Sequence, residues 1–448
     1  MTDVYVIGSS FPALAAALEF AEVGLRVRVA LDTAEPAAEP GGARDHDGAL
    51  SAFLEHVSAP LADGDEPNRG VAPVAIAPQR VQLRNAKGGW TAQPMPAVFG
   101  IPAVPMDAES LAILGGSGAA RAALDRIKPV LTIGKVHEIG TLVRNRMGKT
   151  ALERLVAPFV RERFGASPDQ VEVAVAAPGL NEAVTRAGSL SGAALALADR
   201  DVARETRISP RDGWPQLRAS IISRLELSGA EIHRGLPLDA HPTAVGWRVT
   251  ESDGHRLEVR VAVADPETVV PEAIAAACAL VAPEAWRAHV RVEIEAPELA
   301  DAALAAVQMV LLPSGETWSI RFECDTTQTW SAHLAGPRFE RAPLTTGRSG
   351  NVDAAQQVDT EVADAARQVL AAADVTPLQQ VTVELHPAPH LSLDRRDVET
   401  TAREALREAE PSLLLVGSSL FAGDLADAIA DARSASVTVR RRLTGIAE

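Results

Sequence analysis

Apolar and polar positions follow the periods of strands and helices from the first residues of the chain. An apolar run at 4–7 has the length of a buried strand, and a tight turn at 8–13 follows it. Apolar residues at helical spacing continue over 14–23, and a second apolar strand at 27–31 is closed by Asp32. The pattern predicts a strand–helix–strand unit of the kind with which dinucleotide-binding folds usually begin.

The turn at 8–13 carries an incomplete dinucleotide fingerprint. The fingerprint Gly-x-Gly-x-x-Gly/Ala is met by Gly8 and Ala13, but Ser10 replaces the middle glycine, where the backbone approaches a pyrophosphate. Asp32 stands near the place of the acidic residue that binds a ribose hydroxyl, although Leu31 holds the expected position. From these residues alone, a nucleotide site and an ordinary strand–helix–strand unit are equally well supported.

The rest of the chain alternates between helical and strand-like patterns. Residues 107–204 are mainly helical, and Asp107 is a candidate helix cap. Further helices are predicted at 49–57, 214–227, 271–283, 355–373, 397–408 and 425–442. Strands are predicted at 81–84, 231–234, 246–250, 257–261, 288–295, 306–312, 317–324, 381–385 and 413–417. Because the first and last segments both read as parts of one sheet, an α/β domain interrupted by insertions is predicted.

Composition and charge narrow the class of protein. The chain has 448 residues, of which 47% are hydrophobic and 23% charged, as in a globular protein of two or three domains. A net charge of −16 argues against a nucleic-acid partner. No apolar stretch reaches the length of a membrane span, which leaves peripheral membrane contact open. Only two cysteines and no visible signal peptide fit a cytoplasmic protein.

Several segments together point to a known family. Arg154-Leu155-Val156-Ala157-Pro158-Phe159 and Gly188-Ser189-Leu190 look like that family's helical segment. Residues 213–217 and 235–238 look like the helix and strand that return to its flavin domain, and 417–435 looks like its C-terminal flavin motif. The whole order resembles the FAD-dependent protoporphyrinogen/coproporphyrinogen oxidases, within the flavin amine oxidase superfamily.

This resemblance implies a fold, three parts and an activity. The implied fold is a discontinuous FAD/NAD(P)-binding Rossmann-like domain, with an inserted α+β substrate domain and a helical subdomain. The FAD-binding-type domain takes 1–85, 205–270 and 405–448, the helical subdomain 101–204, and the substrate-type domain 86–100 and 271–404. Members of the family pass hydride from a porphyrinogen to non-covalent FAD and then to dioxygen, in heme biosynthesis. Since the chemistry resides in the flavin ring, neither catalytic residues nor metal ligands are nominated.

The resemblance also nominates the residues that would hold FAD. These are Gly8, Ser10, Ala13, Asp32, Gly41, Gly42, Leu238, Gly417 and Asp424, with a backbone group of Leu238 at the adenine. Several cofactor positions depart from the family pattern, namely Ser10, Leu31, Glu39, Ser418, Ala422 and Asp424. Glu39 and Asp424 place carboxylates where the diphosphate should lie, which costs about 1–4 kcal/mol for like charges a few ångströms apart.

Two functions from different classes follow. The first is a flavoprotein oxidase acting on a porphyrinogen or another small-molecule reductant. The second is a flavin-free homologue that binds a tetrapyrrole, or that pairs with a second copy or with an active homologue. The altered cofactor positions favour the second function. The end-to-end resemblance favours the first, so an FAD-dependent oxidase is the working hypothesis and the flavin-free homologue is the alternative.

Other polar and aromatic residues have plainer interpretations. Basic residues at 144–163 are expected on a solvated helix face rather than on a surface for a polyanion. His386 and His390 are expected in a proline-rich loop rather than as metal ligands, and Trp318 and Trp330 as packing residues. Arg321 is expected to be an exposed strand cation, with a propionate contact as the sharper alternative.

Overall fold

The computed structural model describes residues 2–32, 42–61, 66–129, 137–324, 328–340 and 352–445. Its first sheet has the order β10-β2-β1-β13-β12-β11, and β19 pairs with the end of β13. The pairs among β10, β2, β1, β13 and β19 are parallel, whereas β12 and β11 continue antiparallel. These strands are β1 (Thr2–Ile7), β2 (Val27–Leu31), β10 (Glu231–Arg234), β11 (Asp239–Thr243), β12 (Gly246–Thr250), β13 (Arg256–Ala264) and β19 (Leu413–Leu415).

Both faces of this sheet are buried, which explains the unbroken apolar run in β1. Val4 and Val6 face a core shared with one set of helices, whereas Tyr5 and Ile7 face the opposite core. The first core includes residues of α1 (Phe11–Ala21), α2 (Ala49–Ser58), α10 (Trp214–Leu227) and α14 (Leu425–Thr444), and the second includes α11 (Glu272–Leu280). Helix α1 is the crossover that joins the parallel strands β1 and β2.

A second sheet has the order β18-β14-β17-β16-β15-β5-β6. Its pairs are antiparallel except that of β15 with β5. Helix α12 covers it through Ala366, Val369 and Leu370. The elements are β5 (Val81–Arg84), β6 (Trp90–Ala92), β14 (Ala285–Ile294), β15 (Ala305–Leu311), β16 (Thr317–Cys324), β17 (Trp330–Glu340), α12 (Val352–Ala372) and β18 (Thr382–Pro387).

The middle of the chain is helical and has its own core, which also takes in Val81, Leu83, Ala305 and Val307 of the second sheet. Its helices are α3 (Ala108–Ala123), α4 (Ile139–Met147), α5 (Lys149–Ala151), α6 (Ala157–Phe164), α7 (Val173–Ala176), α8 (Leu180–Ala187) and α9 (Leu190–Glu205). Short helical turns are η1 (Arg69–Val71), η2 (Leu124–Ile127), η4 (Leu152–Val156), η5 (Pro168–Gln170) and η6 (Ser418–Phe421). The remaining elements are β3 (Ala43–Arg44), β4 (Pro73–Ile76), β7 (Ala97–Val98), β8 (Ile101–Pro102), β9 (Arg207–Pro210) and α13 (Leu393–Ala409).

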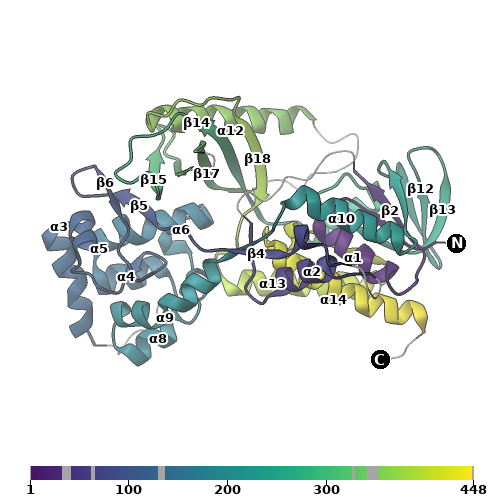
Figure 1. The fold of residues 1–448 in the computed structure, drawn as a ribbon, viewed down its shortest axis with the longest axis horizontal. Helices are drawn as coiled ribbons and strands as arrows, with labels where there is room; N and C mark the ends of the chain where they lie inside the picture. The colour runs from purple at the N-terminus through teal and green to yellow at the C-terminus, as the bar shows by residue number, and fades with distance from the viewer. Residues whose placement is uncertain are drawn as a thin grey trace.

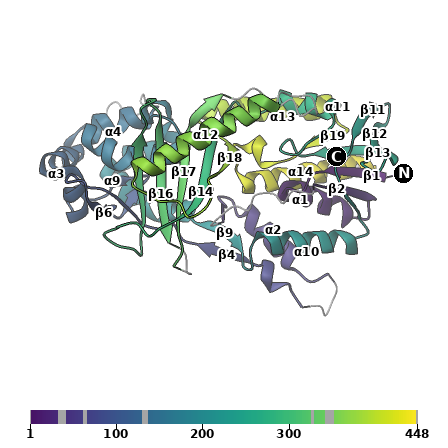
Figure 2. The same ribbon diagram turned by 90° about the horizontal axis from the view of Figure 1, so that it is seen from above.

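The three groups of elements lie side by side along the molecule (Figure 1). Helices α3–α9 lie at the left, the second sheet with α12 at the top, and the first sheet at the right. Seen from above, α12 crosses β14, β16 and β17, and α13 lies beside α11 (Figure 2). The residue boundaries of the three parts that the resemblance implies stay a prediction.

One buried arginine ties the second sheet to the helical part. Arg287 on β14 donates to the carbonyl oxygens of Arg161, Glu162 and Arg163 at the end of α6, at 2.8–3.2 Å. Its Nε donates to the carbonyl oxygen of Gly336 on β17 at 2.8 Å. This side chain therefore satisfies carbonyl groups that the end of a helix leaves without intrahelical partners.

Most predicted elements are close to those observed. Helix α10 and strands β10, β12 and β16 match the predicted residues at both ends. The prediction for His386 was wrong, because β18 extends to Pro387 and takes this histidine into the sheet. None of the helices in the described ranges is long and apolar enough to cross a membrane.

Candidate functional site

The turn between β1 and α1 is held by groups of this chain. The amide of Gly8 donates to the carbonyl of Ala30 at 3.1 Å. Ser10 is the N-cap of α1, and its Oγ accepts a hydrogen bond from the amide of Ala13 at 3.4 Å. Ser9 Oγ accepts from the amide of Asp32 at 2.8 Å, which places Asp32 beside the turn. Two amides of the segment that would face a dinucleotide phosphate, those of Gly8 and Ala13, thus have protein partners.

Asp265 lies between this turn and the C-terminal strand. It follows β13 directly, its amide donates to the carbonyl of Ile7 at 3.1 Å, and only 1% of the residue is exposed. A Cβ on Gly8 would lie 3.0 Å from the Asp265 Cβ, and a Cβ on Gly417 would lie 2.7 Å from Asp265 Oδ1. Both glycines have positive φ angles, of 121° and 147°. The space that these glycines leave is therefore filled by the Asp265 side chain.

Glu267 brings a second carboxylate to the same place. Its Oε1 accepts from Ser418 Oγ at 2.8 Å and from the amide of Ser419 at 2.6 Å. Its own amide donates to Asp265 Oδ1 at 2.9 Å. Burial and the nearby Glu267 charge raise the pKa of Asp265 to about 7, against the opposing hydrogen bonds from Ser10 and the Glu267 amide. Close to neutral pH, Asp265 is therefore protonated in part of the molecules and ionised in the rest.

The C-terminal segment of the site is also capped from within. Asp424 is the N-cap of α14, and its Oδ1 accepts from the amide of Asp427 at 3.1 Å. Burial, with the charges of Asp424 and Asp47, raises the pKa of Asp427 to about 6. Ala422, which stands at a glycine position of the resembled family, has a φ of 52° and so keeps a left-handed backbone. The start of α14 therefore brings several carboxyl groups close together, and the charges of Arg396 and Arg403 partly offset them.

The remaining nominated residues have structural roles of their own. Ala13 is buried in the core of α1. A Cβ on Gly42 would lie 2.7 Å from the carbonyl oxygen of Ile208, so β9 accounts for this glycine. The amide of Leu238 donates to the carbonyl of Thr250 at 2.8 Å, so this amide already has a protein partner. Glu39 and Gly41 lie outside the described residues.

The structure therefore unites part of the nominated set. Gly8, Ser10 and Gly417 meet around Asp265, and Asp32 joins them through Ser9. Sequence reasoning missed Asp265, although Asp265-Pro266 directly after an apolar strand was visible as a signal.

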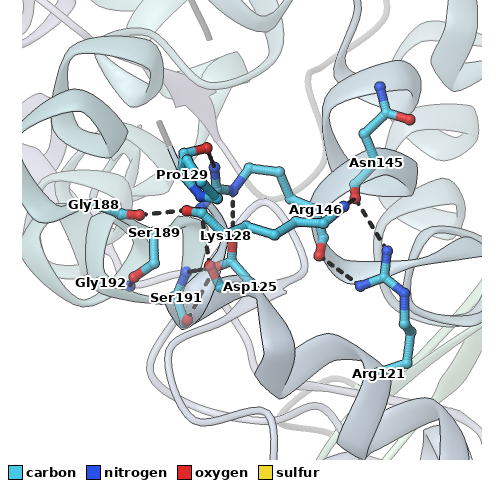
Figure 3. A network of polar contacts seen from close by, with 10 residues as sticks. All are labelled: Arg121, Asp125, Lys128, Pro129, Asn145, Arg146, Gly188, Ser189, Ser191 and Gly192. Carbon is cyan, nitrogen blue, oxygen red and sulfur yellow. Dashed lines mark hydrogen bonds and ion pairs between the residues drawn. The ribbon is translucent and has the colours of Figure 1, made fainter. Parts of the chain in front are cut away.

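The prediction of a solvated face for the basic residues at 144–163 was wrong for two of them. Arg146 is buried and pairs with Asp125, as Figure 3 shows, and it also donates to the carbonyl oxygens of Lys128 and Gly188. Arg163 pairs with Glu205 at 2.8 Å, and Arg44 approaches the other oxygen of the same carboxylate at 3.2 Å.

The second sheet settles two further interpretations. Trp318 and Trp330 are packing residues of its core, as predicted. Arg321 was predicted to be exposed, but it binds both carboxylate oxygens of Glu162, at 2.5 and 3.0 Å. Glu162 therefore already binds the guanidinium that a ligand propionate would have bound.

The residues present do not fit FAD. The diphosphate would approach the backbone at Ser10 and the start of α1. There the Asp265 side chain is hydrogen-bonded by Ser10, and Glu267 lies beside it. Burying another anion beside these two carboxyl groups is costly, although Arg218 lies near and donates to the carbonyl oxygen of Ser9 at 2.6 Å.

Comparison with known proteins identifies the fold. No protein-family model and no curated protein matches the sequence. The structure resembles a protein named as a candidate protoporphyrinogen oxidase from Exiguobacterium sp. 255-15, with a TM-score of 0.64, 16% identity, and coverage of 98% of this chain and 99% of that one. It also resembles a reduced UDP-galactopyranose mutase (TM-score 0.56, 10% identity, 100% and 96% covered). An oxidoreductase from Methanosarcina mazei is similar as well (TM-score 0.53, 10% identity, 99% and 100% covered).

These likenesses confirm the predicted fold class. The chain shares with these proteins a mixed α/β fold with a Rossmann-like domain and a helical part. At such low identity the likeness concerns the fold alone, and the function has to be argued from the site.

Proposed function

We propose that this chain has kept the flavin oxidoreductase fold but works without FAD, as a protein that binds a ligand or a partner. The observation that carries the proposal is the buried Asp265 side chain, which lies against Gly8 and Gly417 and is hydrogen-bonded by Ser10, the position where the fingerprint brings the backbone to a pyrophosphate. A residue from the chain takes the place of the cofactor, and Ser10 and Asp424 cap the two helices that would face it.

Charge supports this proposal. A diphosphate brings two negative charges to a place that already holds Asp265 and Glu267. Two unit charges about 4 Å apart repel by about 1 kcal/mol in water and by about 4 kcal/mol near a protein surface. Each ionised carboxylate at that distance would therefore lower FAD affinity by roughly one to three powers of ten.

Absorbance spectroscopy of the purified full chain tests the proposal. The spectrum between about 300 and 550 nm is recorded as purified, and again after incubation with excess FAD and gel filtration. We expect no flavin bands in either sample and no flavin fluorescence in the supernatant after heat denaturation. Flavin that co-elutes near one equivalent would refute the proposal.

The second candidate function is an FAD-dependent oxidase acting on a porphyrinogen-like substrate in heme biosynthesis. It is favoured by the likeness to the Exiguobacterium protein, which extends over almost the whole of both chains. Its test is oxidation of coproporphyrinogen with added FAD, followed by porphyrin fluorescence and peroxide release. We expect no turnover above the rate without protein, and turnover that depends on both protein and FAD would establish this second function instead.

A further inference from the structure

A cavity of about 490 Å³ lies where the helical part, the second sheet and the C-terminal turn meet. Its walls come from the end of α6, the ends of β14 and β17, the first turns of α13, and Ala422. Ala166, Phe339 and Leu391 supply apolar surface, and Arg338 and His390 supply polar groups. Its volume falls within the range of pockets that bind small organic molecules.

Arg338 is the cation of this cavity for which the described side chains provide no ion pair within 4.0 Å. Its Nη1 donates to the carbonyl oxygen of Pro389. Burial lowers the pKa of Arg338, and the more distant charges of Glu284 and Glu399 oppose this shift. By contrast, Arg395 pairs with Glu284 at 2.7 Å, and His390 approaches Glu399 at 3.5 Å. A guanidinium has five N–H donors, so Arg338 retains donors for a ligand in the cavity.

The surroundings of Arg338 favour one negative charge. Burial and the charges of Arg338, Arg403 and Arg396 lower the pKa of His390 to about 4, so this histidine is neutral at pH 7. The first turns of α13 also form part of the wall, and the start of a helix attracts anions. Glu284 and Glu399 in the same wall disfavour a ligand of higher negative charge.

We propose that this cavity binds an organic carboxylate with an apolar body, whose carboxylate pairs with Arg338 while the body packs on Ala166, Phe339 and Leu391. Guanidinium and carboxylate groups match in geometry and form paired, charge-assisted hydrogen bonds. The inference rests on the proposed function, because it supplies the ligand class of a protein that works by binding.

A fluorescent fatty acid and its methyl ester test the proposal directly. The probe is 11-(dansylamino)undecanoic acid, titrated into the full-length protein while dansyl emission is followed. We expect saturable binding of the acid at least tenfold tighter than that of the ester, since a hydrogen bond to a charged group contributes about 1.5–3 kcal/mol. Equal affinity for acid and ester, or no saturable binding of the acid, would overturn the proposal.

Matched arginine variants locate the carboxylate. R338Q should reduce the acid-over-ester preference to below about twofold, and R338K should keep part of it. R396Q is the matched control, because it also removes one positive charge, but from a residue of α13 that does not line the cavity. This variant should keep the acid-over-ester preference. A preference that survives in R338Q, with circular dichroism showing a folded protein, would contradict the assignment.

The two proposals fail separately. Flavin absorbance of the same samples reports on FAD, and the acid-over-ester ratio reports on Arg338. Bound FAD together with an Arg338-dependent preference would refute the proposed function but retain the carboxylate site, and the converse pattern would refute the site alone.

Discussion

Replacing Asp265 by Asn should change how the stability of the protein depends on pH. Burial holds the pKa of Asp265 at about 7 in the folded protein, against an ordinary value of 3.8. The folded state therefore keeps a proton that the unfolded state has released between these two values. Stability falls as pH rises through this window, because the folded state binds more protons there.

The size of the effect follows from the two pKa values. Between pH 4.5 and 7.5, wild type should lose roughly 3 kcal/mol through this one group, at about 1.4 kcal/mol per unit of pKa difference. The D265N variant cannot lose this proton, and its amide has nearly the shape of the protonated acid. Its stability relative to wild type should therefore rise with pH over the same range.

Urea unfolding at about four pH values between 4.5 and 7.5, followed by tryptophan fluorescence, measures this difference. D253N is the matched control, since Asp253 lies on an exposed turn and accepts a hydrogen bond from the amide of His255. Its stability relative to wild type should not rise with pH. A D265N difference that stays constant within about 0.5 kcal/mol across the range would refute the reasoning.

Three further predictions concern other sites. A422G should be stabilised by about 0.5–1 kcal/mol in urea melts, because residue 422 has a φ of 52° that glycine adopts without strain. The control A435G, within α14, should lose about 1 kcal/mol. A loss of stability in A422G would contradict this reasoning. R146M should lose about 3–5 kcal/mol because it leaves the Asp125 carboxylate buried and unpaired, and D125N/R146M should cost less than the sum of the single variants in a double-mutant cycle. Burial alone would raise the pKa of Glu205, but Arg44 and Arg163 outweigh burial and lower this pKa to about 2. Wild type should therefore lose stability as pH falls from 4.5 towards 2. E205Q should show a shallower loss in acid titrations followed by circular dichroism.

The sequence predicted elements that carry their own local signals. The ends of α10 were predicted correctly because Gly213 and Pro215 mark its start and Gly229 follows its end. Asp107 was predicted as a helix cap, and it accepts a hydrogen bond from the amide of Ser110 at 2.6 Å. Period and capping residues within a few positions contain enough information for such predictions.

What the sequence did not predict depends on residues far apart in the chain. Arg146 was expected on a solvated face because the acidic partner Asp125 lies 21 positions away. The role of Asp265 depends on the pairing of β13 with both β1 and β19, which brings Gly8 and Gly417 to it. Pairing of that kind follows from the folded sheet and leaves no local pattern.

The carbonyl groups bound by Arg287 make the last turn of α6 depend on the second sheet. Any opening that pulls β14 away from α6 must expose a guanidinium and three carbonyl oxygens together. Amide hydrogens at the end of α6 and along β14 should therefore exchange with deuterium through one shared opening, with a common free energy and urea dependence. The junction between helices and sheet is in this sense a single cooperative unit, and a fragment cut between them would fray at α6 first.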